Sequence, residues 1–141
     1  MEPRLSLVTL GVADVPRARA FYERLGFRPS GASKPDVAFF RAGGVVLALW
    51  SRTALAAELG LADPGGGFAG VALAHNVRTR EDVASVTEAW DAAGGHVVKA
   101  PADTFWGGHA AWLADPDGHV WEIVWNPRWP LAADGSLALP S

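Results

Sequence analysis

The sequence predicts an α+β fold made of two tandem β-α-β-β-β modules. The same order of strand-like and helix-like segments occurs twice, at about residues 5–50 and 70–126. A chain of 141 residues is long enough for one domain with its own core. Half of the residues are hydrophobic and 19% are charged, a balance that excludes a disordered chain. We therefore expect a single domain over residues 1–141, with a linker at 51–69 and a tail at 127–141.

The first module opens with a strand-like run over residues 5–12. Asp14 is a typical helix N-cap, and Pro16 suits the first turn because no N–H is needed there. Apolar residues at intervals of three and four then follow one helical face as far as Gly26, where we expect the helix to end. Three short strands are predicted next: Phe27–Ser30, Val37–Arg41 and Val45–Trp50.

The second module repeats this order and starts with a predicted strand at Gly70–His75. Thr79 and Asp82 have the spacing of a helix capping box, and Gly94 ends the predicted helix. A type I turn is predicted at Asp115–Gly118, because Pro occupies its second position and Gly its fourth. The remaining predicted strands are His96–Val98, His109–Ala114 and His119–Trp125.

The linker contains a predicted short helix at about Ala54–Leu61, followed by a glycine-rich stretch that lacks the Lys-Ser/Thr pair of a phosphate loop. In each module, one face of the half-sheet is expected to pack against the helix, and the other face is left open. Two such half-sheets facing each other would form a concave half-barrel cleft.

The composition excludes several classes of function. The chain has no cysteine, so disulfides, cysteine zinc sites and thiol nucleophiles are ruled out. Its net charge of −3 argues against nucleic acid as a partner. No apolar stretch reaches the roughly 18 residues of a membrane span, and Glu2 cancels Arg4 ahead of the one run that could imitate a signal peptide. We expect a cytoplasmic protein with no membrane or nucleic-acid partner.

Two sequence runs carry a family resemblance. Val12–Phe27 contains Phe-Tyr-Glu-Arg-Leu-Gly-Phe, and Ala114–Glu122 contains Asp-Pro-Asp-Gly-His-Val-Trp-Glu. With the duplicated order of elements, these runs resemble the vicinal oxygen chelate (VOC) superfamily of glyoxalase, bleomycin-resistance and extradiol dioxygenase proteins. The resemblance covers about residues 5–127 and implies the glyoxalase/bleomycin resistance/dioxygenase fold. It is poor evidence for one activity, because the superfamily includes isomerases, lyases, dioxygenases and non-catalytic drug-sequestering proteins.

The resemblance also bears on metal binding. Metal-dependent members typically place four His or Glu ligands on inner strands, and these positions correspond here to Leu7, Ala48, Gly70 and Glu122. Only Glu122 can bind a cation, and one carboxylate is too few for a divalent transition metal. The resemblance therefore implies a cleft without the superfamily's metal and without a cofactor, closer to the drug-binding members than to glyoxalase I.

Glu122 is also unusual without the family, because it is the only carboxylate inside an apolar strand run. Pairing across the predicted turn would place Ala111 opposite Glu122 and His109 opposite Val124. Glu122 and His109 would then lie on one face, close enough for a hydrogen bond. Such a pair could act as acid and base, or it could bind a polar group of a ligand. Alternatively, Glu122 is a relict of an ancestral metal site and His109 a rim histidine.

Aromatic residues divide into candidate ligand contacts and candidate core. Trp50 alternates with Ala48 and Val46 and should share their face with Phe39. Trp106 lies in a glycine-containing loop before His109, and for both tryptophans ligand contact and packing remain open. The residues predicted to lie in the core between sheet and helix are Trp90, Trp112, Trp121 and Trp125.

Two classes of function follow. The first is a metal-independent protein that binds or sequesters a largely apolar or aromatic small molecule in a Trp-lined cleft. The alternative is a glyoxalase-like lyase or isomerase that uses Glu122 and His109 for acid and base chemistry, with or without a rebuilt metal site. Because members of the superfamily often pair, we also expect a homodimer.

Overall fold

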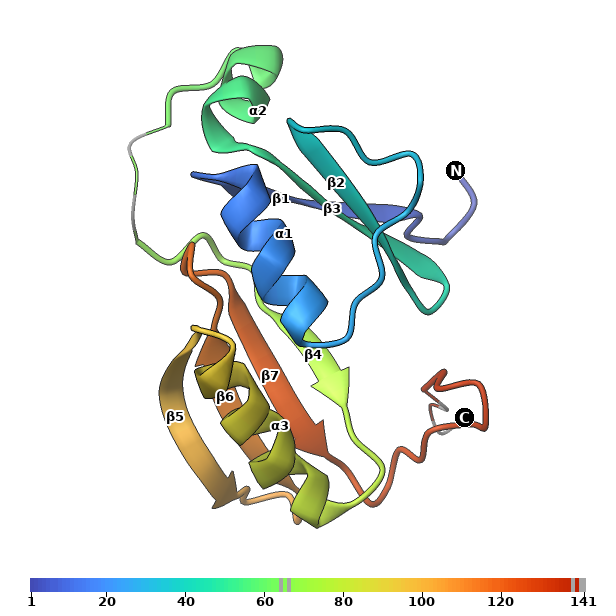
Figure 1. The fold of residues 1–141 in the computed structure, drawn as a ribbon. Coiled ribbons are helices and arrows are strands. Elements are labelled where there is room, and N and C mark those ends of the chain that lie inside the picture. The colour runs from blue at the N-terminus through green and yellow to red at the C-terminus, as the bar shows by residue number, and fades with distance from the viewer. Residues whose placement is uncertain (64, 66, 138, 140–141) are drawn as a thin grey trace. The chain divides into compact units, whose positions relative to one another are not determined.

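In the computed structural model, residues 1–63, 65, 67–137 and 139 are described. The fold is α+β, with one three-stranded and one four-stranded sheet, each accompanied by helices (Figure 1). The chain divides into two compact units, Met1–Ala69 and Gly70–Ser141. The first unit contains the predicted module at about 5–50 together with the predicted linker, and the second contains the predicted module at about 70–126 together with the tail.

The first unit contains a sheet of strand order β1-β3-β2, in which β1 runs parallel and β2 antiparallel to β3. Helix α1 lies over this sheet, and α2 follows β3 directly (Figure 1). The bounds of these elements are β1 Leu7–Val12, α1 Val15–Arg24, β2 Val37–Ala42, β3 Val45–Ser51 and α2 Arg52–Leu59.

Helix α1 begins as the sequence predicts. The Asp14 side chain accepts a hydrogen bond from the N–H of Arg17 at 2.9 Å, so one of the free donors of the first turn is satisfied. The helix buries Phe21 and Tyr22, and the Tyr22 ring lies 6.1 Å from that of Phe40 on β2. This contact places the core of the unit between α1 and one face of the sheet.

The strand predicted at Phe27–Ser30 is wrong, because only an isolated bridge between Pro29 and Phe40 forms there. Proline has no N–H for a continuous ladder. The backbone of Phe39 instead bonds to the loop: its N–H donates to the Ser33 hydroxyl at 3.0 Å, and its carbonyl accepts from Ser30 N–H at 2.7 Å.

The second unit contains a sheet of order β4-β7-β6-β5, in which only the β4–β7 pair is parallel. Helix α3 packs against one face of this sheet (Figure 1). The bounds are β4 Leu73–Asn76, α3 Arg80–Ala92, β5 His96–Asp103, β6 His109–Ala114 and β7 Val120–Trp125.

Helix α3 confirms two predictions. The capping box of Thr79 and Asp82 is complete, since each side chain accepts from the other residue's backbone N–H. Trp90 lies in the core, where its indole N–H donates to the carbonyl of Ala114 at 2.8 Å and its ring lies 5.8 Å from that of Trp121. A Cβ on Gly95 would overlap the Trp90 ring, so this position requires glycine.

The predicted register of β6 and β7 is wrong by one residue. The type I turn forms as expected, with the N–H of Gly118 bonded to the carbonyl of Asp115 at 3.0 Å. Gly118 then adopts a φ of 87° and adds a bulge residue, so that Ala114 pairs with Val120 instead of His119. A shift of one residue moves every side chain of a strand to the other face.

The start of the second unit also differs from the prediction. Strand β4 covers Leu73–Asn76, and Gly70 lies three residues before it, exposed and with a φ of 75°. Ala74, not Gly70, is the residue paired with Glu122. Among the described residues, no helix is long and apolar enough to cross a membrane.

Candidate functional site

A cavity of about 490 Å³ opens on the face of the second unit's sheet that carries Glu122. Strands β4 and β7, the β5–β6 loop and the C-terminal tail all contribute to its lining. We call it the tail cavity. Its lining residues are Ala74, Asn76, Trp106, Glu122, Val124, Asn126, Arg128, Trp129 and Leu137.

Glu122 lies between two apolar neighbours on the adjacent strands. Its partners are Ala74 on β4 and Trp112 on β6. Neither can neutralise a carboxylate, and across the described ranges its side chain makes no hydrogen bond or ion pair. Burial raises the pKa of the Glu122 carboxyl above its ordinary value of 4.5. The site therefore contains an acid that is available to a ligand.

Trp106 reaches the tail cavity from a tight loop between β5 and β6. The N–H of Gly108 donates to the Thr104 hydroxyl at 2.9 Å, and Gly107 takes a φ of 94°. A Cβ on Gly108 would overlap the Trp106 ring, so the glycine makes room for this indole. Phe105, beside it in the chain, is fully exposed and does not line the cavity.

The tail forms the other wall, which the sequence analysis missed. Asn126 shapes it, because its side-chain oxygen accepts the N–H of Arg128 at 3.0 Å and its backbone carbonyl accepts the N–H of Trp129 at 3.2 Å. Arg78 holds the next part, since its guanidinium donates to the carbonyls of Ala132 and Ala133. A signal was present in the sequence: an Arg-Trp pair in a tail that is otherwise rich in Pro, Ala and Gly.

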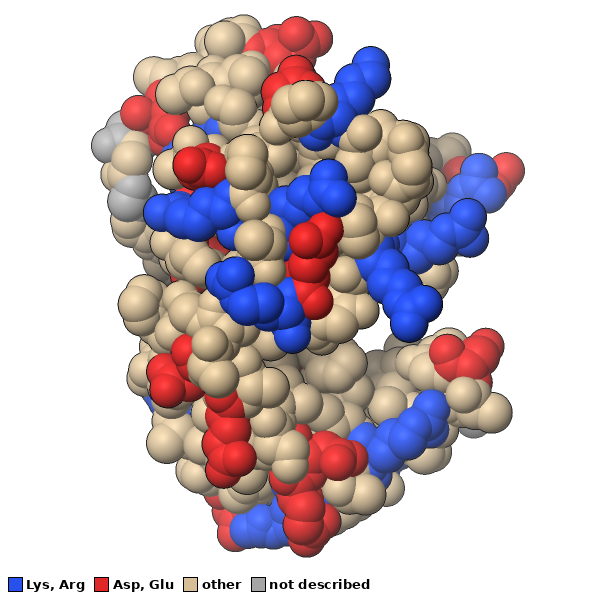
Figure 2. Space-filling model, in the orientation of Figure 1, with Lys and Arg blue, Asp and Glu red and all other residues tan. Residues whose placement is uncertain are grey.

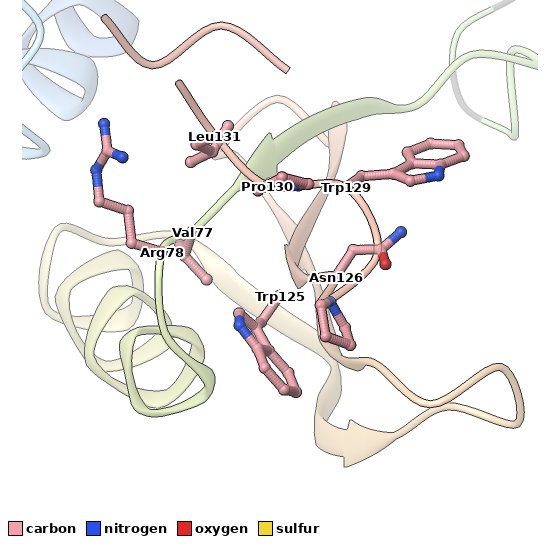
Figure 3. A pocket seen from close by; sticks show the side chains of 8 residues that line it. Val77, Arg78, Trp125, Asn126, Trp129, Pro130 and Leu131 are labelled. Carbon is pink, nitrogen blue, oxygen red and sulfur yellow. The ribbon is translucent and has the colours of Figure 1, made fainter. Parts of the chain in front are cut away.

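A smaller cavity of about 310 Å³ lies beside the same tail segment (Figure 3). Asn126 and Trp129 line both cavities. Figure 3 shows the rings of Trp125 and Trp129 pointing in different directions. Trp125 lines the smaller cavity, whereas Trp129 lines both cavities. The segment after β7 therefore contributes side chains to two neighbouring cavities.

His109 does not lie beside Glu122. It pairs with Trp125, so it lies on the helix side of the sheet, and the expected contact between His109 and Glu122 is wrong. Its Nδ1 instead lies 2.7 Å from the Asp103 carboxylate, which also accepts from Arg80 at 2.6 Å. The hydrogen bond from His109, followed by the charge of Arg80, lowers the pKa of Asp103. This group ties β5, β6 and α3 together.

The same shift of register moves Trp112. It was predicted to lie in the core with the other tryptophans of the second unit, but it is paired with Glu122 on the face away from α3. Trp121 and Trp125 remain on the helix side, as predicted.

The candidate residues of the first unit share one face, as predicted. Ala48 pairs with Phe39, and Val46 pairs with Leu7. Trp50 lies two residues beyond Ala48, on the same face. Leu7, Phe39 and Val46 line a separate cavity of about 480 Å³ near the β2–β3 turn, whereas Ala48 and Trp50 do not.

The model of the Glyoxalase/Bleomycin resistance protein/Dioxygenase superfamily matches residues 4–123. The chain belongs to this superfamily. The match covers most of the chain, including β1 at the start and Glu122 near the end. No curated protein matches the sequence significantly.

Solved structures of the superfamily share this fold. A glyoxalase-related enzyme from Fulvimarina pelagi is 37% identical, with a TM-score of 0.88 and 99% of both chains covered. An enzyme of the superfamily from Burkholderia phytofirmans PsJN is 24% identical, with a TM-score of 0.73 and 85% of this chain and 96% of that chain covered. Lactoylglutathione lyase from Agrobacterium tumefaciens is 20% identical, with a TM-score of 0.66 and coverage of 92% and 98%. The last two likenesses show the fold alone.

The residues around Glu122 do not fit the metal of the superfamily. Its strand neighbours, Ala74 and Trp112, offer no metal-binding atom. The other positions that the resemblance matches to metal ligands, Leu7, Ala48 and Gly70, have no ligating side chain either. Within the described ranges, no group of three or more His, Cys, Asp or Glu side chains could hold a metal ion.

Proposed function

We propose that this member of the superfamily binds or sequesters a small, largely apolar or aromatic molecule in the tail cavity, without a metal ion. The observation that carries the proposal is the carboxylate of Glu122, which has no partner among the described residues and lies in a cavity that Trp106 and Trp129 line. Apolar walls with a few polar groups that fix orientation are typical of small-molecule sites. A volume of about 490 Å³ lies within the usual range for such sites.

A screen of small aromatic compounds by thermal shift tests this proposal, because a ligand that binds the folded protein raises its melting temperature. Trp106→Ala should weaken binding of a hit by about 1–3 kcal/mol through lost aromatic contact. Phe105→Ala is the matched control, since this neighbour is exposed and lies outside the tail cavity. Equal affinities in both variants would contradict the assignment of the site.

The second candidate is an enzyme in which Glu122 acts as a general acid or base. The raised pKa of its carboxyl favours this reading, because catalytic acids work best when they titrate near the operating pH. His109 has no part in it, since it lies on the opposite face. Turnover of each screening hit separates the two candidates: loss of turnover in Glu122→Gln with affinity retained would favour the enzyme.

We also propose that the protein forms a homodimer at micromolar concentration. Exposed apolar side chains in each unit, including Leu7 in the first and Val98 in the second, support association. Light scattering tests it: a dimer mass is expected, and a monomer mass throughout the micromolar range would contradict it.

A further inference from the structure

Two opposite charges line the tail cavity without forming an ion pair. Glu122 comes from β7, and Arg128 from the tail segment that follows it. In the part of the chain that the structure describes, neither side chain takes part in an ion pair or a side-chain hydrogen bond. A ligand in this cavity therefore meets one free carboxylate and one free guanidinium.

Among the residues that the structure describes, Arg128 is the only Lys or Arg of the second unit at this cavity. The unit has three other Lys or Arg residues, and none of them lines the tail cavity. Arg78 binds the carbonyls of Ala132 and Ala133, Arg80 pairs with Asp103, and Lys99 is exposed on β5. An anionic group in the cavity would therefore depend on Arg128.

The net charge of the second unit disfavours a purely anionic ligand. The unit carries nine Asp or Glu residues against four Lys or Arg. Carboxylates gather over α3 in the lower part of the view in Figure 2, on the face of the sheet opposite to the tail cavity. A unit of this charge attracts cations and repels anions. A ligand with both signs of charge avoids this repulsion and still reaches Arg128.

The backbone around Arg128 is held in place. Its N–H is bonded to the side chain of Asn126, and the next residue, Trp129, closes the turn on the carbonyl of Asn126. Trp129 faces the same cavity as Trp106, so aromatic surface accompanies the two charges. The aromatic surface suits an apolar body, and each charged group suits one end of a polar head.

We propose that the tail cavity selects a zwitterion: an aromatic or apolar body that carries a cationic donor for Glu122 and an anionic group for Arg128. This inference rests on the proposed function and names its ligand class. A ligand with a single charge would leave one of the two protein charges without a partner, and the cost is greater at Glu122, which is partly buried, than at the exposed Arg128. A zwitterion satisfies both charges at once.

Three compounds that share a phenylethyl group test the proposal on the wild-type protein. L-Phenylalanine carries both charges, 3-phenylpropionate lacks the ammonium group, and phenethylamine lacks the carboxylate. Isothermal titration calorimetry at pH 7.5 should show that L-phenylalanine binds at least tenfold more tightly than either comparator. Equal affinities for the three compounds would contradict the ligand class.

Two variants assign each end of the ligand. Glu122→Gln should weaken the binding of L-phenylalanine and phenethylamine about tenfold, while 3-phenylpropionate should bind this variant at least as tightly as the wild type. Arg128→Gln should weaken the binding of L-phenylalanine and 3-phenylpropionate, while phenethylamine should bind this variant at least as tightly as the wild type. Glu88→Gln and Lys99→Gln remove exposed charges of the same unit outside the cavity, so they should change none of the affinities. Parallel losses for all three compounds in either test variant would overturn the proposal.

The outcome separates this inference from the proposed function. Suppose that uncharged hits of the thermal-shift screen bind, that Trp106→Ala weakens their binding, and that the three phenylethyl compounds bind equally. The proposed ligand class is then wrong, but the assignment of the binding site to the tail cavity is supported. If no compound binds, whether neutral or charged, both the proposed function and the proposed ligand class are wrong.

Discussion

Glu122 is a partly buried carboxylate with apolar neighbours on both adjacent strands, Ala74 and Trp112. Such a group lowers the stability of the folded protein whenever it is charged, because the unfolded chain hydrates it better. This cost is consistent with a residue kept for a ligand, since a ligand donor would relieve it.

This cost predicts a pH-dependent effect of Glu122→Gln. The pKa of Glu122 is raised in the folded state, so the native protein binds more protons and loses stability as the pH rises from 4.5 through the folded pKa. The variant should match the wild type at pH 4 and exceed it at pH 8 by about 1 kcal/mol or less. Urea unfolding at both pH values measures this. A variant that is less stable than the wild type at pH 8 would show that Glu122 has a protein partner.

His109 has a structural role, and this gives a second prediction. His109→Ala removes a hydrogen bond to Asp103 from a mostly buried side chain, so it should lower the free energy of unfolding by about 1–2 kcal/mol. Binding at the tail cavity should not change. His96→Ala, at an exposed strand start, is the control. A double variant of His109 and Glu122 with non-additive effects on ligand affinity would restore the pair predicted from sequence.

At the scale of the element, the β6–β7 connection decides which residues reach the site. Asp115 is fully buried there, and its carboxylate accepts the N–H groups of Asp117 and His119 at 2.9 Å each. These bonds hold the turn and the Gly118 bulge together. The register that they support places Glu122, and not its neighbours, on the face of the tail cavity.

Asp115→Ala should therefore destabilise the protein strongly for a single residue. Two N–H groups would lose their acceptor, at a cost of about 1–3 kcal/mol or more in the free energy of unfolding. Asp115→Asn keeps one acceptor oxygen, so it should lower the free energy of unfolding by a smaller amount. Asp91→Ala, on the exposed surface of α3, should have little effect. A difference below about 0.5 kcal/mol between the Asp115 and Asp91 variants would contradict this role for the carboxylate.

The elements themselves could be predicted from the sequence because their signals are local. The N-caps Asp14 and Thr79 mark the starts of α1 and α3, and β6 covers the predicted residues His109–Ala114. The pairing register of β6 and β7 was harder to predict. A turn motif shows where a chain reverses, but whether Gly118 closes the turn or adds a bulge depends on the buried carboxylate of Asp115.

The candidate site was predicted only in part, because its local signals are visible in the sequence but the register of its strands is not. Glu122 and Trp106 do line one cavity, since an acid in an apolar strand and an aromatic loop are visible in sequence. His109 was misplaced by the register, and Gly70 by a strand that starts three residues later. The contribution of the tail to the cavity was missed. Arg128 and Trp129 reach the cavity through a turn, and no periodic sequence pattern predicts that turn.

At the scale of the whole molecule, each unit has its own core, and neither core contains a set of metal ligands among the described residues. We expect the protein to keep its melting temperature in excess chelator, because no metal binding is coupled to folding. Thermal unfolding with and without EDTA, together with elemental analysis of the purified protein, checks this. A stoichiometric zinc, nickel or iron ion, or a fall in melting temperature with chelator, would contradict it.

The indole N–H signals of the seven tryptophans test the ligand site in one experiment, a ¹H–¹⁵N correlation spectrum recorded during titration with a hit of the thermal-shift screen. Single Trp→Phe variants assign the signals. Binding at the tail cavity predicts saturable shifts of Trp106 and Trp129 with one common Kd, while buried Trp90 stays unchanged. Shifts confined to Trp50 on the first sheet, or no saturable shift of Trp106 and Trp129, would contradict the site.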